Sequence, residues 1–128
     1  MAEFERRVLI VDDDELNRLL LEHMVRQLGL QPLSATDGET AVQACAAQRF
    51  ALIMMDRRMP GLDGYEALAR IREVEAAAGR SPVPAILLSG DLDRPGDASP
   101  VEAGFVGALL KPFRLDDLST LVARVLGD

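Results

Sequence analysis

The stretch Arg7-Val-Leu-Ile-Val-Asp-Asp-Asp, residues 7–14, joins a short apolar run to three consecutive carboxylates. The apolar run is too short for a helix, and its Val, Leu and Ile residues are typical of a strand buried on both faces of a sheet. Asp14 stands where its side chain can cap a helix that follows. We therefore expect a buried strand at Arg7–Val11 that ends in acidic residues.

Three further apolar runs have the same character, and each predicts another buried strand. They lie at Ala51–Met55, Ala85–Leu88 and Ala108–Leu110. Because Gly29 is placed to end the first helix, Leu30–Ala35 becomes a fifth strand, in which Pro32 is tolerated if it lies near the start.

The segments between these strands carry apolar residues at helical spacing. The first stripe extends over residues 16–28, and Gly29 is placed to end that helix. Proline and glycine within Asp91–Pro100 oppose a continuous helix before the last strand, so at best a short helix starts after Ser99. The other stripes contain Val42 and Cys45, Leu68 and Ile71, and Leu115, Leu118, Val122 and Val125. The expected order is βαβαβαβαβα, which predicts a parallel sheet covered by helices on both faces.

The composition suits one soluble domain over residues 1–128, with its core at about residues 6–126. Acidic residues outnumber basic ones by 21 to 14, and the net charge of −7 disfavours binding to nucleic acid or to an anionic membrane. No apolar run approaches the roughly 20 residues of a membrane span, and the N-terminus lacks a secretory signal, so we expect a cytoplasmic protein. The single cysteine, Cys45, is expected to fill the core, and His23 to be solvated.

Side chains with chemical function follow the predicted strands. Asp12 and Asp13 follow the first strand, while Asp56, Ser89 and Lys111 follow three others. Because the carboxyl ends of parallel strands share one edge, we expect these groups to converge there. Two carboxylates about 4 Å apart repel by roughly 4 kcal/mol at an effective dielectric constant near 20, so the cluster requires a cation. Mg²⁺ is suitable, because it takes oxygen ligands and uses one or two carboxylates.

Four segments at these strand ends form a specific combination: Val8–Asp14, Leu52–Gly64, Ile86–Gly90 and Leu110–Phe113. Each is modest by itself, but in this order and at these intervals they resemble the receiver domains of response regulators. The resemblance covers nearly the whole chain. It implies a flavodoxin-like, doubly wound α/β fold with five parallel strands in the order 2-1-3-4-5 and helices on both faces.

The resemblance implies that Asp56 is the phosphoacceptor of a two-component or phosphorelay system. It would take a phosphoryl group from a phosphohistidine of a histidine kinase or histidine phosphotransfer protein. Ser89 stands where the family has a hydroxyl that donates to a phosphoryl oxygen, and Lys111 where a lysine pairs with the same group. Pro112 suggests a cis peptide that turns the lysine inward. The chain would switch a downstream protein target, and would be no enzyme beyond catalysing its own phosphorylation and dephosphorylation.

The resemblance also implies a Mg²⁺ site beside the phosphoacceptor. Asp13 would bind the ion directly, Asp12 would assist through water, and Asp56 and the backbone carbonyl of Arg58 would complete the protein ligands. Asp14 lies outside the matched pair and keeps its role as a helix cap.

Two positions raise questions about the switch. Many receivers have Tyr or Phe three positions before the lysine, whereas this chain has Ala108, so the usual aromatic part of the switch is absent. We expect the segment Asp91–Pro100 to move as the output element. Arg58 and Asp91 are placed to pair across the mouth of the site, which would shield an acyl phosphate from water.

Two other functions are compatible with an acidic cluster. A phosphatase with an aspartyl nucleophile would need to turn over an exogenous substrate and would usually have a cap for it. A pseudo-receiver would bind partners without being phosphorylated, and would fail to bind Mg²⁺. Within the receiver family, the chain fits a stand-alone regulator, a phosphorelay intermediate or a receiver from a longer protein such as a hybrid histidine kinase.

Overall fold

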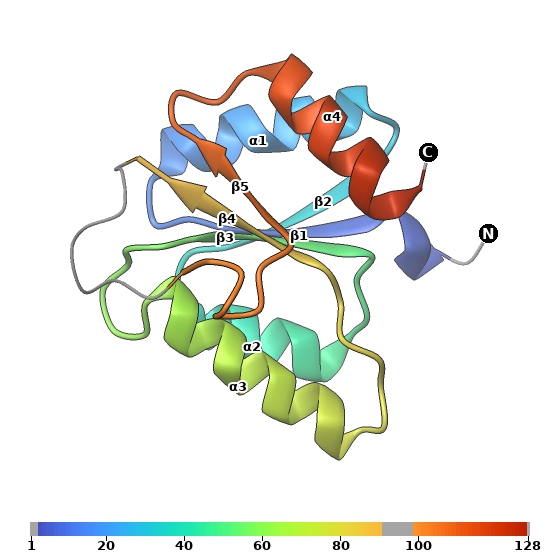
Figure 1. Ribbon diagram of the computed structural model, residues 1–128, viewed down its shortest axis with the longest axis vertical. Helices are drawn as coiled ribbons and strands as arrows, with labels where there is room; N and C mark the ends of the chain where they lie inside the picture. Colours follow the sequence, from blue (N-terminus) through green and yellow to red (C-terminus); the bar gives the residue numbers. More distant parts are fainter. Residues whose placement is uncertain (1–2, 91–98, 128) are drawn as a thin grey trace.

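The fold is built on one parallel sheet, which a computed structural model shows together with its covering helices (Figure 1). The structure describes residues 3–90 and 99–127. The strands are β1 (Arg7–Val11), β2 (Gln31–Ala35), β3 (Leu52–Asp56), β4 (Ala85–Ser89) and β5 (Gly107–Leu110). They follow the order β2-β1-β3-β4-β5, and each neighbouring pair is parallel. The predicted α/β class and strand order are confirmed.

Helices cover both faces of the sheet, as expected. A short 3₁₀ helix, η1 (Glu3–Arg6), precedes α1 (Glu15–Gln27), α2 (Gly38–Ala47), α3 (Gly64–Ala77) and α4 (Leu115–Leu126). Helices α1 and α4 lie on one face, and α2 and α3 lie on the other (Figure 1). In the part of the chain that the structure describes, no helix has the length and apolar character needed to cross a membrane.

The central strand β3 is buried along its whole length. Ile53 and Met55 belong to the apolar cluster under α2 and α3, whereas Leu52 and Met54 belong to the cluster under α1 and α4. This alternation explains why the run is apolar without interruption, since each face of the strand meets a helix layer. Full burial of such a side chain contributes about 1.5–3 kcal/mol. The packing holds Asp56, the last residue of the strand, in a well-defined place.

Side-chain caps begin the helices next to the carboxyl edge of the sheet. Asp14 caps α1, as predicted, and accepts a hydrogen bond from the N–H of Leu16 at 3.0 Å. Asp63 caps α3 in a reciprocal pair with Glu66, with bonds of 2.8 and 3.1 Å. Each cap satisfies an amide that the helix leaves without a partner, which is worth about 1 kcal/mol. After the end of α1, Gly29 has a φ of 79°, a left-handed conformation that glycine adopts readily.

The short helix expected after Ser99 is not found in the described residues 99–106, between β4 and β5. Residues 100–104 form turns, and the N–H of Phe105 donates to the carbonyl oxygen of Pro100 at 2.9 Å. Pro100 has no N–H to donate, and Gly104 has a φ of 104°, which is incompatible with a continuing helix. Residues 91–98, most of the expected output element, lie outside the described residues.

The two residues expected to be chemically inert have the predicted environments. Cys45 on α2 is buried, and His23 on α1 is exposed. Burial raises the pKa of the Cys45 thiol to about 12. The thiol therefore stays protonated near neutral pH, in keeping with a role in packing.

Candidate functional site

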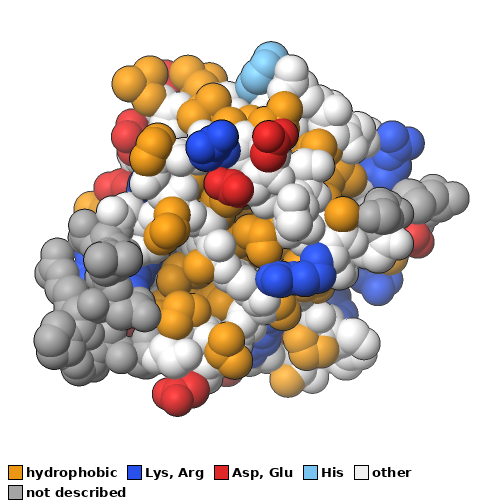
Figure 2. Space-filling view, turned by 45° about the horizontal axis from the view of Figure 1, so that its top comes forward, with side chains coloured by type: hydrophobic (Ala, Val, Ile, Leu, Met, Phe, Trp, Pro, Cys, Tyr) orange, Lys and Arg blue, Asp and Glu red, His pale blue; other side chains and the backbone are white. Residues whose placement is uncertain are grey.

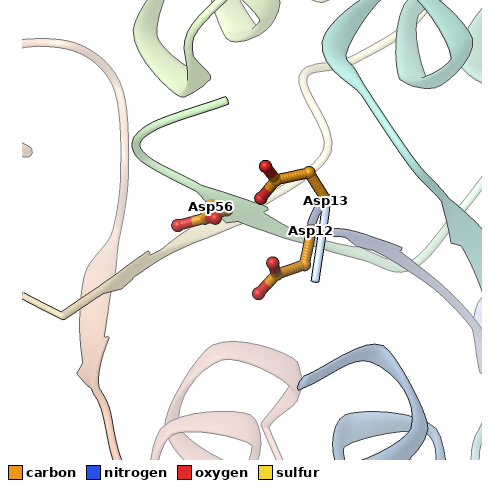
Figure 3. Close-up of side chains that lie close together, drawn as sticks. All are labelled: Asp12, Asp13 and Asp56. Carbon is orange, nitrogen blue, oxygen red and sulfur yellow. The ribbon is translucent and has the colours of Figure 1, made fainter. Parts of the chain in front are cut away.

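Three carboxylates lie together at the carboxyl edge of the sheet (Figure 3). Asp12 and Asp13 directly follow β1, and Asp56 ends the neighbouring strand β3. Carboxylate oxygens of the three residues lie within 4.8 Å of one another. Asp12 and Asp56 are buried, whereas Asp13 is exposed. The convergence that strand order predicts for these side chains is therefore present.

Lys111 places a positive charge between two of these acids. Its Nζ donates a hydrogen bond to Oδ1 of Asp56 at 3.2 Å and lies 3.6 Å from Oδ2 of Asp12. The backbone N–H of Lys111 donates to the carbonyl oxygen of Ser89 at 2.8 Å, which ties the residue after β5 to the end of β4. The Lys111–Pro112 peptide is cis, as predicted.

Asp12 is held through three of its own polar groups. Its N–H donates to the carbonyl oxygen of Ala35 at 3.3 Å, and its carbonyl oxygen accepts from Nη1 of Arg18 at 2.8 Å. Its Oδ1 accepts from the N–H of Asp14 at 2.9 Å. The remaining oxygen, Oδ2, is buried and has no hydrogen-bond partner within the described part of the chain. A buried anionic oxygen without a donor is costly, so this atom is suited to bind a cation.

The charge at Asp56 is only partly compensated. Its pKa is raised to about 6, mainly by burial and then by the charge of Asp12, while Lys111 acts in the opposite direction. One ammonium group therefore does not offset the buried acids at neutral pH. A hard divalent cation fits a donor set made of carboxylate oxygens and would supply the missing charge.

The carboxylates open into a cleft with a volume of about 240 Å³. The cleft collects all the site residues predicted from the sequence, including Ser89 and Arg58. Its lining is formed by Asp12, Asp13, Asp14, Asn17, Asp56, Arg57, Arg58, Ser89, Gly90 and Lys111. The expected ion pair between Arg58 and Asp91 involves a residue outside the described part of the chain.

The sequence prediction missed three polar residues around this cleft. Asn17 and Arg57 line it, and Arg18 bonds to the backbone of Asp12. Asn17 and Arg18 could have been identified from the sequence by their position near the start of the helix that follows the acidic loop. Asn17 lies three residues after the cap Asp14, on the side of the helix that faces the loop.

Arg57 belongs to a small stack of side chains next to Asp56. It is 7% exposed, and its Cζ lies 5.1 Å from the centre of the Tyr65 ring. Tyr65 in turn packs against Phe105, with ring centres 5.7 Å apart and planes inclined by 41°. The stack thus connects the residue after Asp56 to the turn before β5. No local pattern in the sequence indicates it, because its members come from three separate segments.

The turn after β3 brings α3 close to Asp56. A Cβ atom at Gly64 would overlap the backbone carbonyl oxygen of Asp56, so only glycine fits without a shift. The N–H of Gly64 also donates to the carbonyl oxygen of Arg57 at 2.9 Å. The backbones of the two segments therefore approach closely at Gly64.

Sequence comparisons identify relatives over almost the whole chain. The family model for the response regulator receiver domain matches residues 8–123. The sensor protein GacS of Pseudomonas syringae pv. syringae is 32% identical over 121 residues, which cover 94% of this chain and 13% of GacS. The cyclic di-GMP phosphodiesterase response regulator RpfG of Xanthomonas campestris pv. campestris is 31% identical over 127 residues, which cover 98% of this chain and 33% of RpfG. This chain therefore spans only a minor part of either relative.

Solved structures share the fold. The receiver domain of the sensor histidine kinase PA1611 from Pseudomonas aeruginosa PAO1 has a TM-score of 0.82 and 32% identity, and the match covers 96% of this chain and 98% of that one. It was crystallised with a magnesium ion coordinated in its active-site cleft. A Saccharomyces cerevisiae co-crystal structure joins the histidine phosphotransfer protein Ypd1 to the receiver domain of its downstream response regulator Ssk1. That match has a TM-score of 0.81 and 28% identity, over 91% of this chain and 86% of the other.

Proposed function

Because the chain belongs to the response regulator receiver family, we propose that Asp56 accepts a phosphoryl group from a phosphohistidine of a histidine kinase or histidine phosphotransfer protein. The observation that carries this proposal is the setting of the Asp56 carboxylate, 3.2 Å from the Lys111 ammonium and beside two further carboxylates. An ionised carboxylate attacks phosphorus without a general base. The reaction mainly needs compensation for the negative charge around phosphorus.

We assign a Mg²⁺ ion to the carboxylate cluster. Asp12, Asp13, Asp56 and the backbone carbonyl of Arg58 would hold it, and the buried Oδ2 of Asp12 supports this assignment because it has no hydrogen-bond donor among the described residues. When bound, Mg²⁺ supplies the positive charge that offsets the acceptor carboxylate and the oxygens of the transferring group. The magnesium-bound receiver domain of PA1611 is a precedent within the family.

The transfer exchanges one bond to phosphorus for another. A carboxylate oxygen of Asp56 bonds to phosphorus opposite the leaving imidazole nitrogen of the partner. The phosphorus–nitrogen bond breaks, and its electron pair stays on the imidazole. Lys111 pairs with one phosphoryl oxygen, and the hydroxyl of Ser89 donates a hydrogen bond to another. The product is an acyl phosphate on Asp56, which adds negative charge at the end of β3.

The exposed side of α1 is the proposed docking surface for the phosphohistidine partner. Leu16, Leu19 and Leu20 are 75%, 52% and 41% exposed, and Asn17 on the same helix lines the cleft. Figure 2 shows hydrophobic side chains exposed on the face that α1 and α4 cover. An apolar patch beside the acceptor suits a partner that must bring its phosphohistidine to Asp56. The occupant would be a protein of the same kind as Ypd1.

A charged substitution on α1 separates docking from chemistry. Leu19→Asp is expected to slow transfer from a phosphorylated histidine phosphotransfer protein by about tenfold, since interface anchors of this size contribute about 1–2 kcal/mol. Phosphorylation by acetyl phosphate is expected to be unchanged, because a small donor needs no docking surface. Leu33→Asp, on an exposed position of β2, is the matched control. An equal loss with both donors would contradict docking at α1.

The proposed output is a change in the surface formed by residues 99–106 and β5. This region exposes apolar side chains to a downstream protein, with Val101 74% and Leu110 58% exposed. Ala108 has no aromatic ring to reorient, so the turn before β5 is the element that responds to the added charge. Amide hydrogen exchange across residues 99–110 is expected to change when a phosphoryl mimic binds. Identical exchange in both states would remove this region from the output.

The proposal is tested by intact mass after incubation with Mg²⁺ and acetyl phosphate. The native chain is expected to gain roughly 80 Da, the mass of one phosphoryl group, whereas Asp56→Asn gains nothing. A gain in both would place the acceptor elsewhere. No gain in the native chain, together with no binding of Mg²⁺, would favour a pseudo-receiver, and release of many equivalents of phosphate from a phosphomonoester would favour a phosphatase.

A further inference from the structure

The contacts around Asp12 single out Arg18, a residue that the transfer reaction does not use. We propose that Arg18 is a positioning residue for the cation site, because it holds the peptide that joins Asp12 to Asp13 and so directs the carboxylate of Asp13. The inference rests on the proposed Mg²⁺-dependent function. Arg18 itself is not part of the cleft lining formed by the described residues.

The geometry of the contact defines what Arg18 can do. Its Nη1 donates to the carbonyl oxygen of Asp12 at 2.8 Å, and its own N–H donates to the carbonyl oxygen of Asp14 at 3.0 Å. The carbonyl group of Asp12 belongs to the planar peptide that leads to Asp13. A bond to that oxygen restricts rotation of the peptide plane, which sets the direction of the Cα–Cβ bond of Asp13. Arg18 thereby ties both ends of the acidic loop to α1.

Asp13 needs such support more than Asp12 does. Asp12 is fully buried and is also held by bonds to Ala35 and Asp14. Asp13 is exposed, so packing does not hold its side chain. Groups that orient metal ligands from outside commonly change metal affinity by about 10–100-fold when they are removed. The Arg18 side chain reaches the Asp12–Asp13 peptide oxygen from α1, the helix that follows the acidic loop.

Charge alone makes the opposite prediction. Arg18 is a cation near the acidic loop, so by electrostatics its removal would tighten Mg²⁺ binding. If Arg18 acts by positioning, its removal weakens binding despite the loss of a repelling charge. The sign of the change therefore separates the two explanations.

The experiment measures Mg²⁺ affinity by calorimetry for the native chain, Arg18→Met and Arg18→Lys. Arg26→Met is the matched control, because Arg26 is an exposed cation on the same helix, 3.9 Å from Glu22. We expect Arg18→Met to bind Mg²⁺ about tenfold more weakly, and Arg18→Lys, which keeps one donor, to recover part of the loss. Arg26→Met is expected to stay within about twofold of the native chain.

A second readout separates positioning from general damage. At saturating Mg²⁺, Arg18→Met is expected to regain a native rate of phosphorylation by acetyl phosphate, because the defect lies in cation affinity. Unchanged or tighter Mg²⁺ binding by a folded Arg18→Met would overturn the inference and leave the phosphoacceptor function intact. If Arg18→Met does not fold, Arg18→Lys decides: because it keeps the charge but loses the fork of donors, weaker Mg²⁺ binding than native supports the positioning role, and native affinity overturns it. Absence of Mg²⁺ binding by the native chain would overturn both the inference and the proposed function.

Discussion

Two buried acidic sites at opposite edges of the sheet differ in how their charge is satisfied. Glu75 on α3 is 4% exposed, and its two oxygens accept bonds from Nη1 of Arg72 at 2.8 Å and from the N–H of Val83, just before β4, at 2.9 Å. At the carboxyl edge, Asp12 and Asp56 share one ammonium group, and one oxygen of Asp12 has no hydrogen-bond partner in the described chain. Protein groups complete the first site, whereas the second needs a cation. The first site is suited to stabilise the fold, and the second is the proposed phosphoacceptor site.

The largest expected effect comes from removing Lys111, the cation that contacts both Asp12 and Asp56. Lys111→Met should slow phosphorylation by acetyl phosphate at saturating Mg²⁺ about 100-fold or more, because one preorganised charge on the transferring group is worth about 3 kcal/mol. An intact-mass time course measures the rate. Arg114→Met removes a nearby exposed charge and should leave the rate unchanged. A loss below about threefold for Lys111→Met would remove this lysine from the reaction.

The next largest effect is expected from a substitution that removes the hydrogen bonds of Glu75. Glu75→Ala should lower the free energy of unfolding by about 2–3 kcal/mol, since it leaves the N–H of Val83 without its acceptor and Arg72 without its partner. Urea denaturation measures this change, and phosphorylation of the folded variant should stay native. Glu73→Ala, an exposed position on the same helix, is the control and should change stability by less than about 0.5 kcal/mol. Equal effects of the two substitutions would show that the Glu75 site contributes nothing special.

The smallest effect has the opposite sign and depends on pH. The pKa of Asp56 is raised from 3.8 to about 6 in the folded chain, so between these values the native state binds more protons than the unfolded state. Its contribution to stability therefore falls as pH rises through this window and levels off above it. Without Mg²⁺, Asp56→Asn should be more stable than the native chain by about 1–2 kcal/mol at pH 7, and equally stable near pH 4. A constant difference across this range would contradict the electrostatic cause.

The predictable part of the site follows from local patterns combined with strand order. A buried apolar run indicates where each strand ends, and parallel order then brings Asp12, Asp56 and Lys111 to one edge although they are far apart in the chain. Arg18 and Glu75 could not be predicted in this way. Each bonds to a backbone group, and the positions of those groups depend on loops that only the folded chain defines.

The turn before β5 shows the limit of composition as a guide. The prolines and glycines of this segment predict an interrupted helix. They do not predict that residues 99–106 lack a helix altogether. That outcome depends on the left-handed backbone of Gly104 and on the packing of Phe105 against Tyr65. The stack of Arg57, Tyr65 and Phe105 also could not be predicted from local sequence, because it depends on how separate segments pack together.

The burial of Cys45 makes the chain convenient for site-specific labelling. Cys45 is 5% exposed, and the pKa of its thiol, about 12, leaves almost no thiolate at neutral pH, so maleimide reagents will spare it in the folded protein. A cysteine introduced at the exposed Ala108 would be the sole reactive thiol. A fluorophore attached there would report movement of β5 during phosphorylation, with the native cysteine left in place.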